Sequence, residues 1–85
     1  MTEQPLEANF STLILSIASS AAMALGLAPH PETQQITKDL PMAKFNIDLL
    51  LLLKTKTNGN LENEELQFLE SVINDLQLKY VQMNK

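Results

Sequence analysis

Apolar residues recur at helical spacing in the first third of the chain. Between Asn9 and Leu25 they are separated by steps of three and four residues, so they would lie on one face of a helix. Asn9 is a suitable N-cap, and Gly26 is a suitable stop because glycine readily adopts the left-handed conformation that follows many helices. We therefore predict a helix over 9–25. Its apolar face consists of Phe10, Ile14, Ile17, Ala21 and Ala24.

A second helix is predicted from Asp39 to Lys56, and its apolar residues form two separate seams. Pro41 fits the first turn, where a missing backbone N–H costs little, and Asp39 can accept a hydrogen bond from a free N–H there. The five consecutive leucines at 49–53 span more than one turn, so one neighbouring helix could not cover both seams. The first seam contains Met42, Phe45, Leu49 and Leu52, and the second contains Ala43, Ile47 and Leu50.

A third helix is predicted to begin between Asn60 and Glu62 and to end near Gln82. Its apolar residues follow a heptad pattern, which is typical of a seam in a helical bundle. The loop 57–60 is short, so the second and third helices should form an antiparallel hairpin, with Gly59 and Asn60 as its hinge. The heptad seam is made of Leu66, Leu69, Ile73, Leu76, Tyr80 and Met83.

These elements predict a single all-α domain at residues 9–82, built as a small three-helix bundle. The connection 26–38 contains two prolines separated by one residue, which keep it out of the helical conformation. Residues 1–8 show no apolar period and are expected to form a flexible N-terminal tail, with a second short tail at 83–85.

The composition suggests that this bundle is completed by dimerisation. A chain of 85 residues builds a small core, whose net stability is expected to be only about 3–5 kcal/mol. It has no cysteine for a disulfide, so self-association is the remaining common support. We expect a homodimer, in which the first helix packs either within its own chain or across to the second copy. The candidate interface residues are Phe10, Ile14, Ile17, Ala18, Ala22, Leu49, Leu50, Leu51, Leu52 and Leu53.

No residue pattern points to catalysis, to a metal or to a cofactor. His30 is the single histidine, and with Glu32 it lacks the further ligands that a metal site needs, so we interpret both as loop residues. The serines of the first helix have no histidine or lysine at a defined offset, and two glycines cannot build a phosphate-binding loop. We therefore expect no catalytic residue, no cofactor and no enzymatic activity.

Asp48 is a carboxylate between Ile47 and the leucine block. A buried, unpaired carboxylate would be costly, so we expect Asp48 to face solvent, Lys44 one turn earlier, a hydroxyl of the first helix or a chain terminus. A contact with a ligand is the alternative. The acidic residues that open the third helix are interpreted as compensation for its dipole. They are Glu62, Glu64 and Glu65.

Charge and hydropathy narrow the range of partners. A net charge of −4 without any arginine argues against nucleic acid, because affinity for the phosphate backbone comes from lysine and arginine. The segment from Phe10 to Leu27 is uncharged, but it is rich in serine and alanine and lacks flanking basic residues, so a membrane span is not expected. The acidic N-terminus does not look like a secretion signal, and we expect a cytoplasmic protein.

Three functions are compatible with these features. The first is a structural or interaction domain that self-associates and presents its first helix or its acidic surface to an unidentified protein partner. The second is a peripheral membrane or lipid-binding module that uses the first helix. The third is a small-molecule-binding domain with a pocket between the helices.

Two blocks of the sequence are distinctive, namely Ile-Asp-Leu-Leu at 47–50 and the hinge Lys-Thr-Asn-Gly-Asn-Leu at 56–61. Further matching segments are Phe10 to Ala18, Ala24 to Gly26, Ala43, Glu65, Leu69, Glu70 and Leu76 to Val81. Together they resemble the bacterial family catalogued as domain of unknown function 1844. The resemblance implies a small, helical, soluble bacterial domain, and it implies no activity.

Two positions depart from the pattern of this family. The family usually has a threonine at the position of Glu62, which would form a capping box with Glu65, and here Asn60 is the alternative cap. The family also tends to carry an arginine near the end of the third helix, where this sequence has Gln77 and Lys79. Neither side chain offers the planar fork of arginine, so a bidentate ion pair or ligand contact is not expected there.

Overall fold

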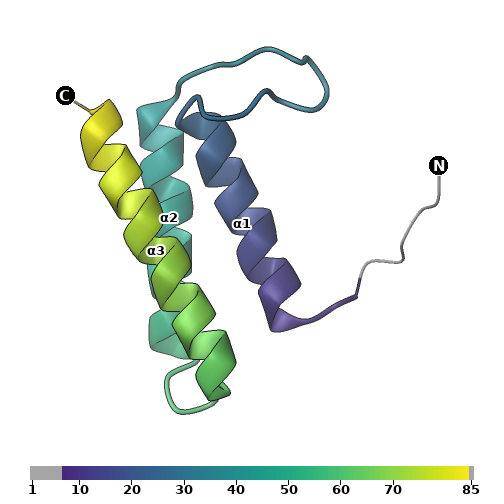
Figure 1. Ribbon diagram of the computed structural model, residues 1–85, viewed down its shortest axis with the longest axis vertical. Coiled ribbons are helices and arrows are strands. Elements are labelled where there is room, and N and C mark those ends of the chain that lie inside the picture. Colours follow the sequence, from purple (N-terminus) through teal and green to yellow (C-terminus); the bar gives the residue numbers. More distant parts are fainter. Residues whose placement is uncertain (1–6, 85) are drawn as a thin grey trace.

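The computed structural model describes residues 7–84, and the chain forms three helices (Figure 1). They are α1 (Phe10–Ala24), α2 (Leu40–Lys56) and α3 (Asn63–Met83). Helix accounts for 68% of the described residues, and none of them belongs to a β-strand. The all-α class and the three helical segments predicted from apolar spacing are therefore confirmed. The N-terminal tail predicted at 1–8 lies mostly outside the described residues, as does Lys85.

α1 begins and ends where its sequence predicts. The side chain of Asn9 caps the helix, because its Oδ1 accepts a hydrogen bond from a backbone N–H of the first turn at 2.8 Å. At the other end Gly26 has a φ of +80°, and its N–H donates to the carbonyl of Met23 at 3.0 Å. The N–H of Leu27 donates to the carbonyl of Ala22 at 3.0 Å. These two bonds form a Schellman motif, in which glycine is favoured at the left-handed position.

α2 also has a side-chain cap and a glycine beyond its end. The Oδ1 of Asp39 accepts a hydrogen bond from the N–H of Met42 at 3.2 Å. After the helix, the N–H of Asn60 donates to the carbonyl of Thr57 at 2.9 Å and closes a tight turn. Gly59 lies inside this turn with a φ of +85°, which is the left-handed conformation expected for the hinge.

α3 begins with a different cap from the one expected. The helix starts at Asn63, and Glu62 is its N-cap residue. The backbone N–H of Glu62 donates to the carboxylate of Glu65 at 2.9 Å. The prediction that Asn60 caps this helix is wrong, because Asn60 belongs to the hinge turn and lies before the helix. α3 continues to Met83, one residue past its predicted end.

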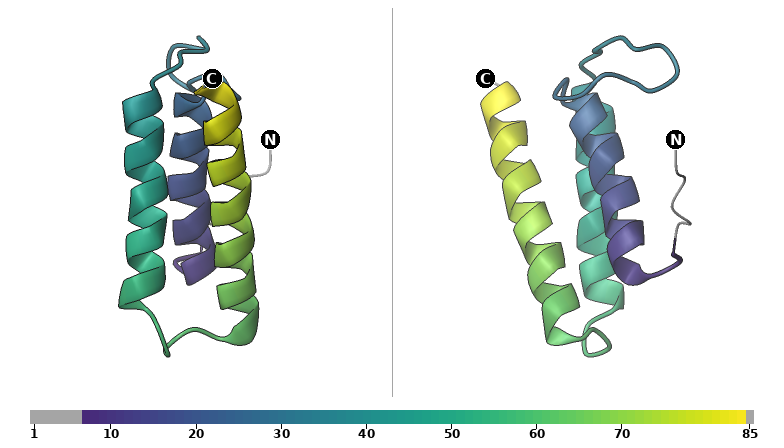
Figure 2. Two further views of the ribbon diagram at one scale, coloured as in Figure 1. Left: turned by 90° about the vertical axis from the view of Figure 1, so that its left-hand side faces the viewer. Right: turned by 45° about the vertical axis from the view of Figure 1, so that its right-hand side comes forward.

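The connection between α1 and α2 is a long loop that projects past the ends of the helices (Figure 2). Its two ends are held together. The N–H of Asp39 donates to the carbonyl of Ala24 at 2.7 Å, and an isolated antiparallel bridge pairs Leu25 with Lys38. The loop therefore returns the chain to the start of α2 directly beside the end of α1.

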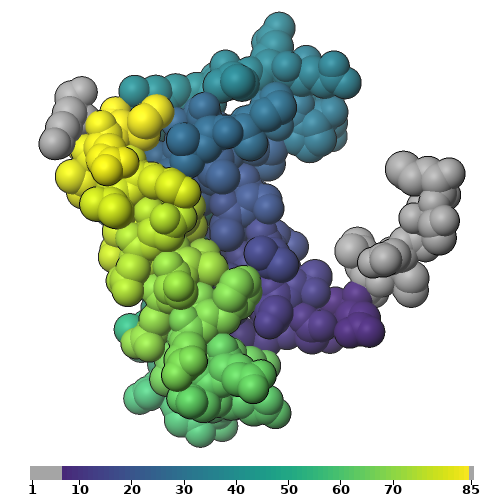
Figure 3. Space-filling model, viewed as in Figure 1, coloured from purple at the N-terminus to yellow at the C-terminus, as the bar shows by residue number. Residues whose placement is uncertain are grey.

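The three helices pack against one another around one core. α2 and α3 are joined at the lower end of the molecule in Figure 1, and α3 then runs back toward the end at which α2 begins. α1 packs on both, more extensively on α2 than on α3. In the space-filling view α3 lies over most of α2, with α1 beside it (Figure 3).

The core draws apolar side chains from all three helices. Three of its members are alanines on α1 and α2, and such small side chains leave room for close approach of the two helices. The buried core residues are Ile14, Ala21, Ala24, Leu25, Ala43, Ile47, Leu50, Leu69, Ile73 and Leu76.

Candidate functional site

An apolar stripe remains exposed along α2. Met42, Phe45 and Leu52 are 48%, 55% and 52% exposed, and Leu49 between them is half-buried. We call these four residues the outer seam. In a helix with 3.6 residues per turn they fall within roughly 80° of the circumference, so their side chains follow one line along the helix.

The outer seam is exposed because α1 and α3 cover the other side of α2. The second seam predicted for this helix lies in the core, where Ala43, Ile47 and Leu50 are buried. Asn46 is also buried, and its Nδ2 donates to the carbonyl of Met42 at 3.0 Å. One seam of α2 thus holds the chain together, and the other faces away from it.

The candidate interface residues from the sequence occupy different environments in the structure. Ile14 and Leu50 are fully buried in the core of the chain itself. Leu51 and Leu52 are exposed. The half-buried members are Phe10, Ile17, Ala18, Ala22, Leu49 and Leu53. Met42 and Phe45 were absent from that candidate set, although their spacing with Leu49 and Leu52 is a signal that could have included them.

α1 exposes an apolar side chain on the side that borders α2. Ser20 and Met23 of α1 line a pocket together with Met42 and Asn46 of α2, so this side of α1 borders α2. Leu13 lies seven residues, or two turns, before Ser20 and therefore on the same side of α1. It is 44% exposed. Leu13 is therefore an exposed leucine on the side of α1 that borders α2.

The flank of the outer seam carries a pair of opposite charges. The Nζ of Lys44 lies 3.0 Å from Oδ2 of Asp48, one turn further along α2. This hydrogen bond and the negative charge of Asp48 raise the pKa of Lys44 above its ordinary value. Of the partners considered for Asp48 in the sequence analysis, Lys44 is the one that the structure shows. Both side chains are largely exposed, so the pair is accessible to a second molecule.

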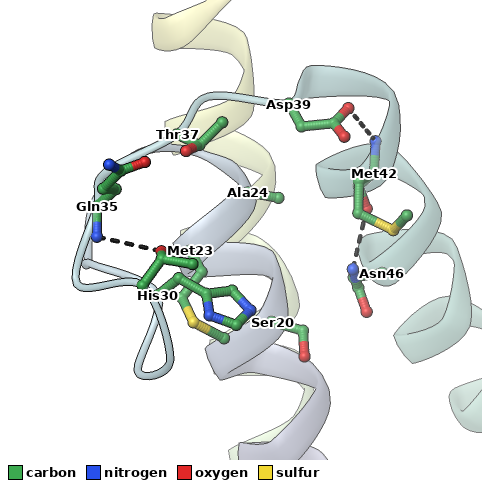
Figure 4. A pocket seen from close by; sticks show the side chains of 10 residues that line it. Ser20, Met23, Ala24, His30, Gln35, Thr37, Asp39, Met42 and Asn46 are labelled. Carbon is green, nitrogen blue, oxygen red and sulfur yellow. Dashed lines mark hydrogen bonds between the residues drawn. The ribbon is translucent and has the colours of Figure 1, made fainter.

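A pocket of about 530 Å³ opens between α1, the loop and the start of α2 (Figure 4). Its floor is apolar, with Met23, Ala24 and Met42, and the amide of Asn46 lies at its α2 side. The sequence identified His30 only as a loop residue, whereas the structure places it on the wall of this pocket. The Nδ1 of His30 accepts a hydrogen bond from the N–H of a residue in its own loop at 3.2 Å, so this atom is already engaged.

A second pocket of about 790 Å³ lies beside the hinge. Lys54 of α2 and Glu70 of α3 line it and form an ion pair at 3.1 Å that ties the two helices together. Gly59 lies at its edge. Both charges are partly exposed, so this pair is expected to contribute little to stability.

A family model described as "Domain of unknown function (DUF1844)" matches residues 7–82. The chain belongs to the DUF1844 family. The match covers α1, α2 and all but the last residue of α3, and it confirms the resemblance seen in the Ile-Asp-Leu-Leu block and the hinge. No curated protein and no solved structure matches the chain significantly.

The position at which the resemblance leads one to expect an arginine is filled differently in this DUF1844 domain. Near the end of α3 the Nζ of Lys79 lies 2.8 Å from Oδ2 of Asp75, one turn earlier in the same helix. Gln77 between them is exposed. The lysine therefore pairs with a carboxylate of its own helix.

The described part of this DUF1844 domain contains neither a metal-binding cluster nor a membrane-spanning helix. Across residues 7–84, no three side chains of histidine, aspartate or glutamate come together in a group that could hold a metal ion. No helix in the same range combines the length and apolar character needed to cross a membrane.

Proposed function

We propose that this chain is a non-enzymatic helical interaction domain that forms a homodimer through the outer seam of α2. The observation that carries this proposal is the exposure of Met42, Phe45 and Leu52, with the half-buried Leu49 between them, on one line of the helix. Monomeric soluble proteins rarely leave a contiguous apolar stripe in contact with water, and such a stripe commonly marks a protein interface. In a two-fold dimer the same surface is used twice, so one exposed seam covers another.

The small size of the chain supports the same proposal. Ten buried apolar residues form the core, and no cysteine is available for a disulfide. Burying two copies of the outer seam would add apolar contacts that the isolated chain lacks. We expect the half-buried residues of α1 to contribute at the edge of this interface. We further propose that the domain works in the bacterial cytoplasm and that its acidic surface is available to another protein.

The alternative, a peripheral membrane module that uses α1, has less support. The apolar face of α1 is occupied, because Ile14, Ala21 and Ala24 lie in the core. Its exposed leucines, Leu13 and Leu15, are separated by roughly 160° around the helix and form no stripe. A helix that lies on a membrane needs one broad apolar face, and α1 does not expose such a face.

Size-exclusion chromatography coupled to light scattering tests the dimer. We expect a mass near twice the 9.5 kDa of the chain at tens of micromolar. The double variant Phe45→Glu/Leu52→Glu should elute as a folded monomer, because it places charges in the seam. Leu78→Glu is a matched control, since Leu78 is an equally exposed leucine (59%) on α3. A monomeric wild type, or an equal loss of dimer in the control, would contradict the proposal.

A further inference from the structure

The outer seam of α2 is symmetric along the helix. Phe45 and Leu49 lie two residues on either side of position 47, and Met42 and Leu52 lie five residues on either side. A two-fold axis perpendicular to α2 near this position would therefore place large apolar residues opposite large apolar residues. No shift along the helix is needed to match the two seams.

We infer that the partner of the outer seam is a second copy of this chain whose α2 runs antiparallel to the first. Phe45 of each copy then lies beside Leu49 of the other, and Met42 lies beside Leu52. This inference deepens the proposed function and rests on it, because it specifies the geometry of the same dimer. Two helices in such contact are typically about 8–10 Å apart, close enough for these side chains to interdigitate.

The charges beside the seam favour this orientation. Lys44 and Asp48 lie on one flank, and their midpoint is one residue from the proposed two-fold axis. In the antiparallel arrangement Lys44 of one copy comes near Asp48 of the other, so each charge gains a second partner of opposite sign. In a parallel two-fold pair the axis runs along the helices, so the flank with Lys44 and Asp48 lies on opposite sides of the interface in the two copies. The charged pair would gain no second partner from the other copy in that arrangement.

The exposed position of α2 leaves room for a second copy. The two neighbours of α2 within the chain meet it through Ala43, Ile47 and Leu50, on the side opposite to Phe45 and Leu52. Leu13 is exposed on the side of α1 that borders α2, and the pair of Lys44 and Asp48 flanks the seam on α2 itself. The contact would thus have an apolar centre with a charged pair at one edge, which is the usual pattern of a protein interface.

Disulfide trapping tests the orientation, because the natural chain contains no cysteine. Met42 and Leu52 are separated by about 15 Å along α2 at 1.5 Å per residue. In the antiparallel dimer two copies of Met42→Cys cannot reach each other, since bridged cysteines need Cα atoms within about 7 Å. A mixture of Met42→Cys with Leu52→Cys, one of them carrying a size tag, should form a mixed disulfide under mild oxidation. Each variant alone should stay uncrosslinked.

The outcomes separate this inference from the proposed function. If the wild type is monomeric by light scattering, both the proposed homodimer and its antiparallel geometry are contradicted. A dimeric wild type with disulfides in Met42→Cys alone, or with no crosslink in the mixture, overturns only the antiparallel geometry. A mixture of Met42→Cys with Leu78→Cys is the control for random collision, and its yield should stay several-fold below that of the first mixture. Equal yields in the two mixtures would also overturn the geometry.

Discussion

At the scale of single residues, Gly59 is needed for its backbone conformation and not because a side chain would clash. Its φ is +85°, and a Cβ added there would meet no atom within 4 Å. The space around it would accept a side chain, but the left-handed backbone disfavours one. The hinge between α2 and α3 therefore depends on the backbone freedom of this glycine.

We predict that Gly59→Val destabilises the domain by about 1–2 kcal/mol, the usual cost of a left-handed conformation for a residue with a Cβ. Asn58→Ala should have a much smaller effect. Gly59→Asn should recover most of the loss, because asparagine tolerates this conformation better than valine does. Chemical denaturation of the three variants measures these differences. Equal stability of Gly59→Val and wild type would show that the hinge does not need this conformation.

Asp48 shows which features of a single side chain can be predicted from the sequence. The cost of burying a charge predicts that Asp48 is exposed or paired, and it is both, with Lys44 at 3.0 Å. The sequence could not choose among the partners left open, because that choice depends on which face of α2 points away from the core. The place of His30 on the wall of the pocket could not be predicted in this way, because it depends on the course of the whole loop.

At the scale of elements, α2 differs from its neighbours because it carries apolar residues on two sides. The spacing of both seams is clear in the sequence, and so are its caps. Asp39 accepts from the N–H of Met42, and its own N–H donates to the carbonyl of Ala24. Asp39 therefore fixes both the start of α2 and the place at which the loop returns to α1.

We predict that Asp39→Ala destabilises the domain by about 1 kcal/mol, the typical cost of losing an N-cap. Asp39→Asn is the matched control, because its side-chain oxygen can keep the hydrogen bond while the charge is removed. The difference between the two variants in thermal or chemical unfolding separates the hydrogen bond from the interaction of the carboxylate with the helix dipole. If Asp39→Ala were as stable as wild type, the cap would have no role in holding α2.

At the scale of the whole molecule, the packing of residues 7–84 leaves one face of α2 without a neighbour. Three helices bury one stripe each, and the described chain has a fourth stripe in the outer seam. A homodimer would couple folding to association, because the dimeric state is favoured at higher protein concentration.

We therefore predict that the melting temperature of the wild type rises with protein concentration over the range in which the dimer forms. The double variant Phe45→Glu/Leu52→Glu should melt at a temperature independent of concentration, since it removes the seam without touching the core. Leu78→Glu should behave like the wild type. Differential scanning calorimetry at several concentrations gives the measurement, and a wild-type melting temperature that stays constant would argue against a coupled dimer.

The sequence by itself determined the three helices, their caps at Asn9 and Asp39, the glycine of the hinge and the two seams of α2. These features depend on spacing within a segment and on the conformational preference of single residues, which are local properties. Only the tertiary structure decided which seam of α2 is buried. Both seams have helical spacing, so the choice depends on how side chains from different helices fit together. The buried seam is the one that contains Ala43, which joins Ala21 and Ala24 of α1 in the core, and the bulky Phe45 stays outside.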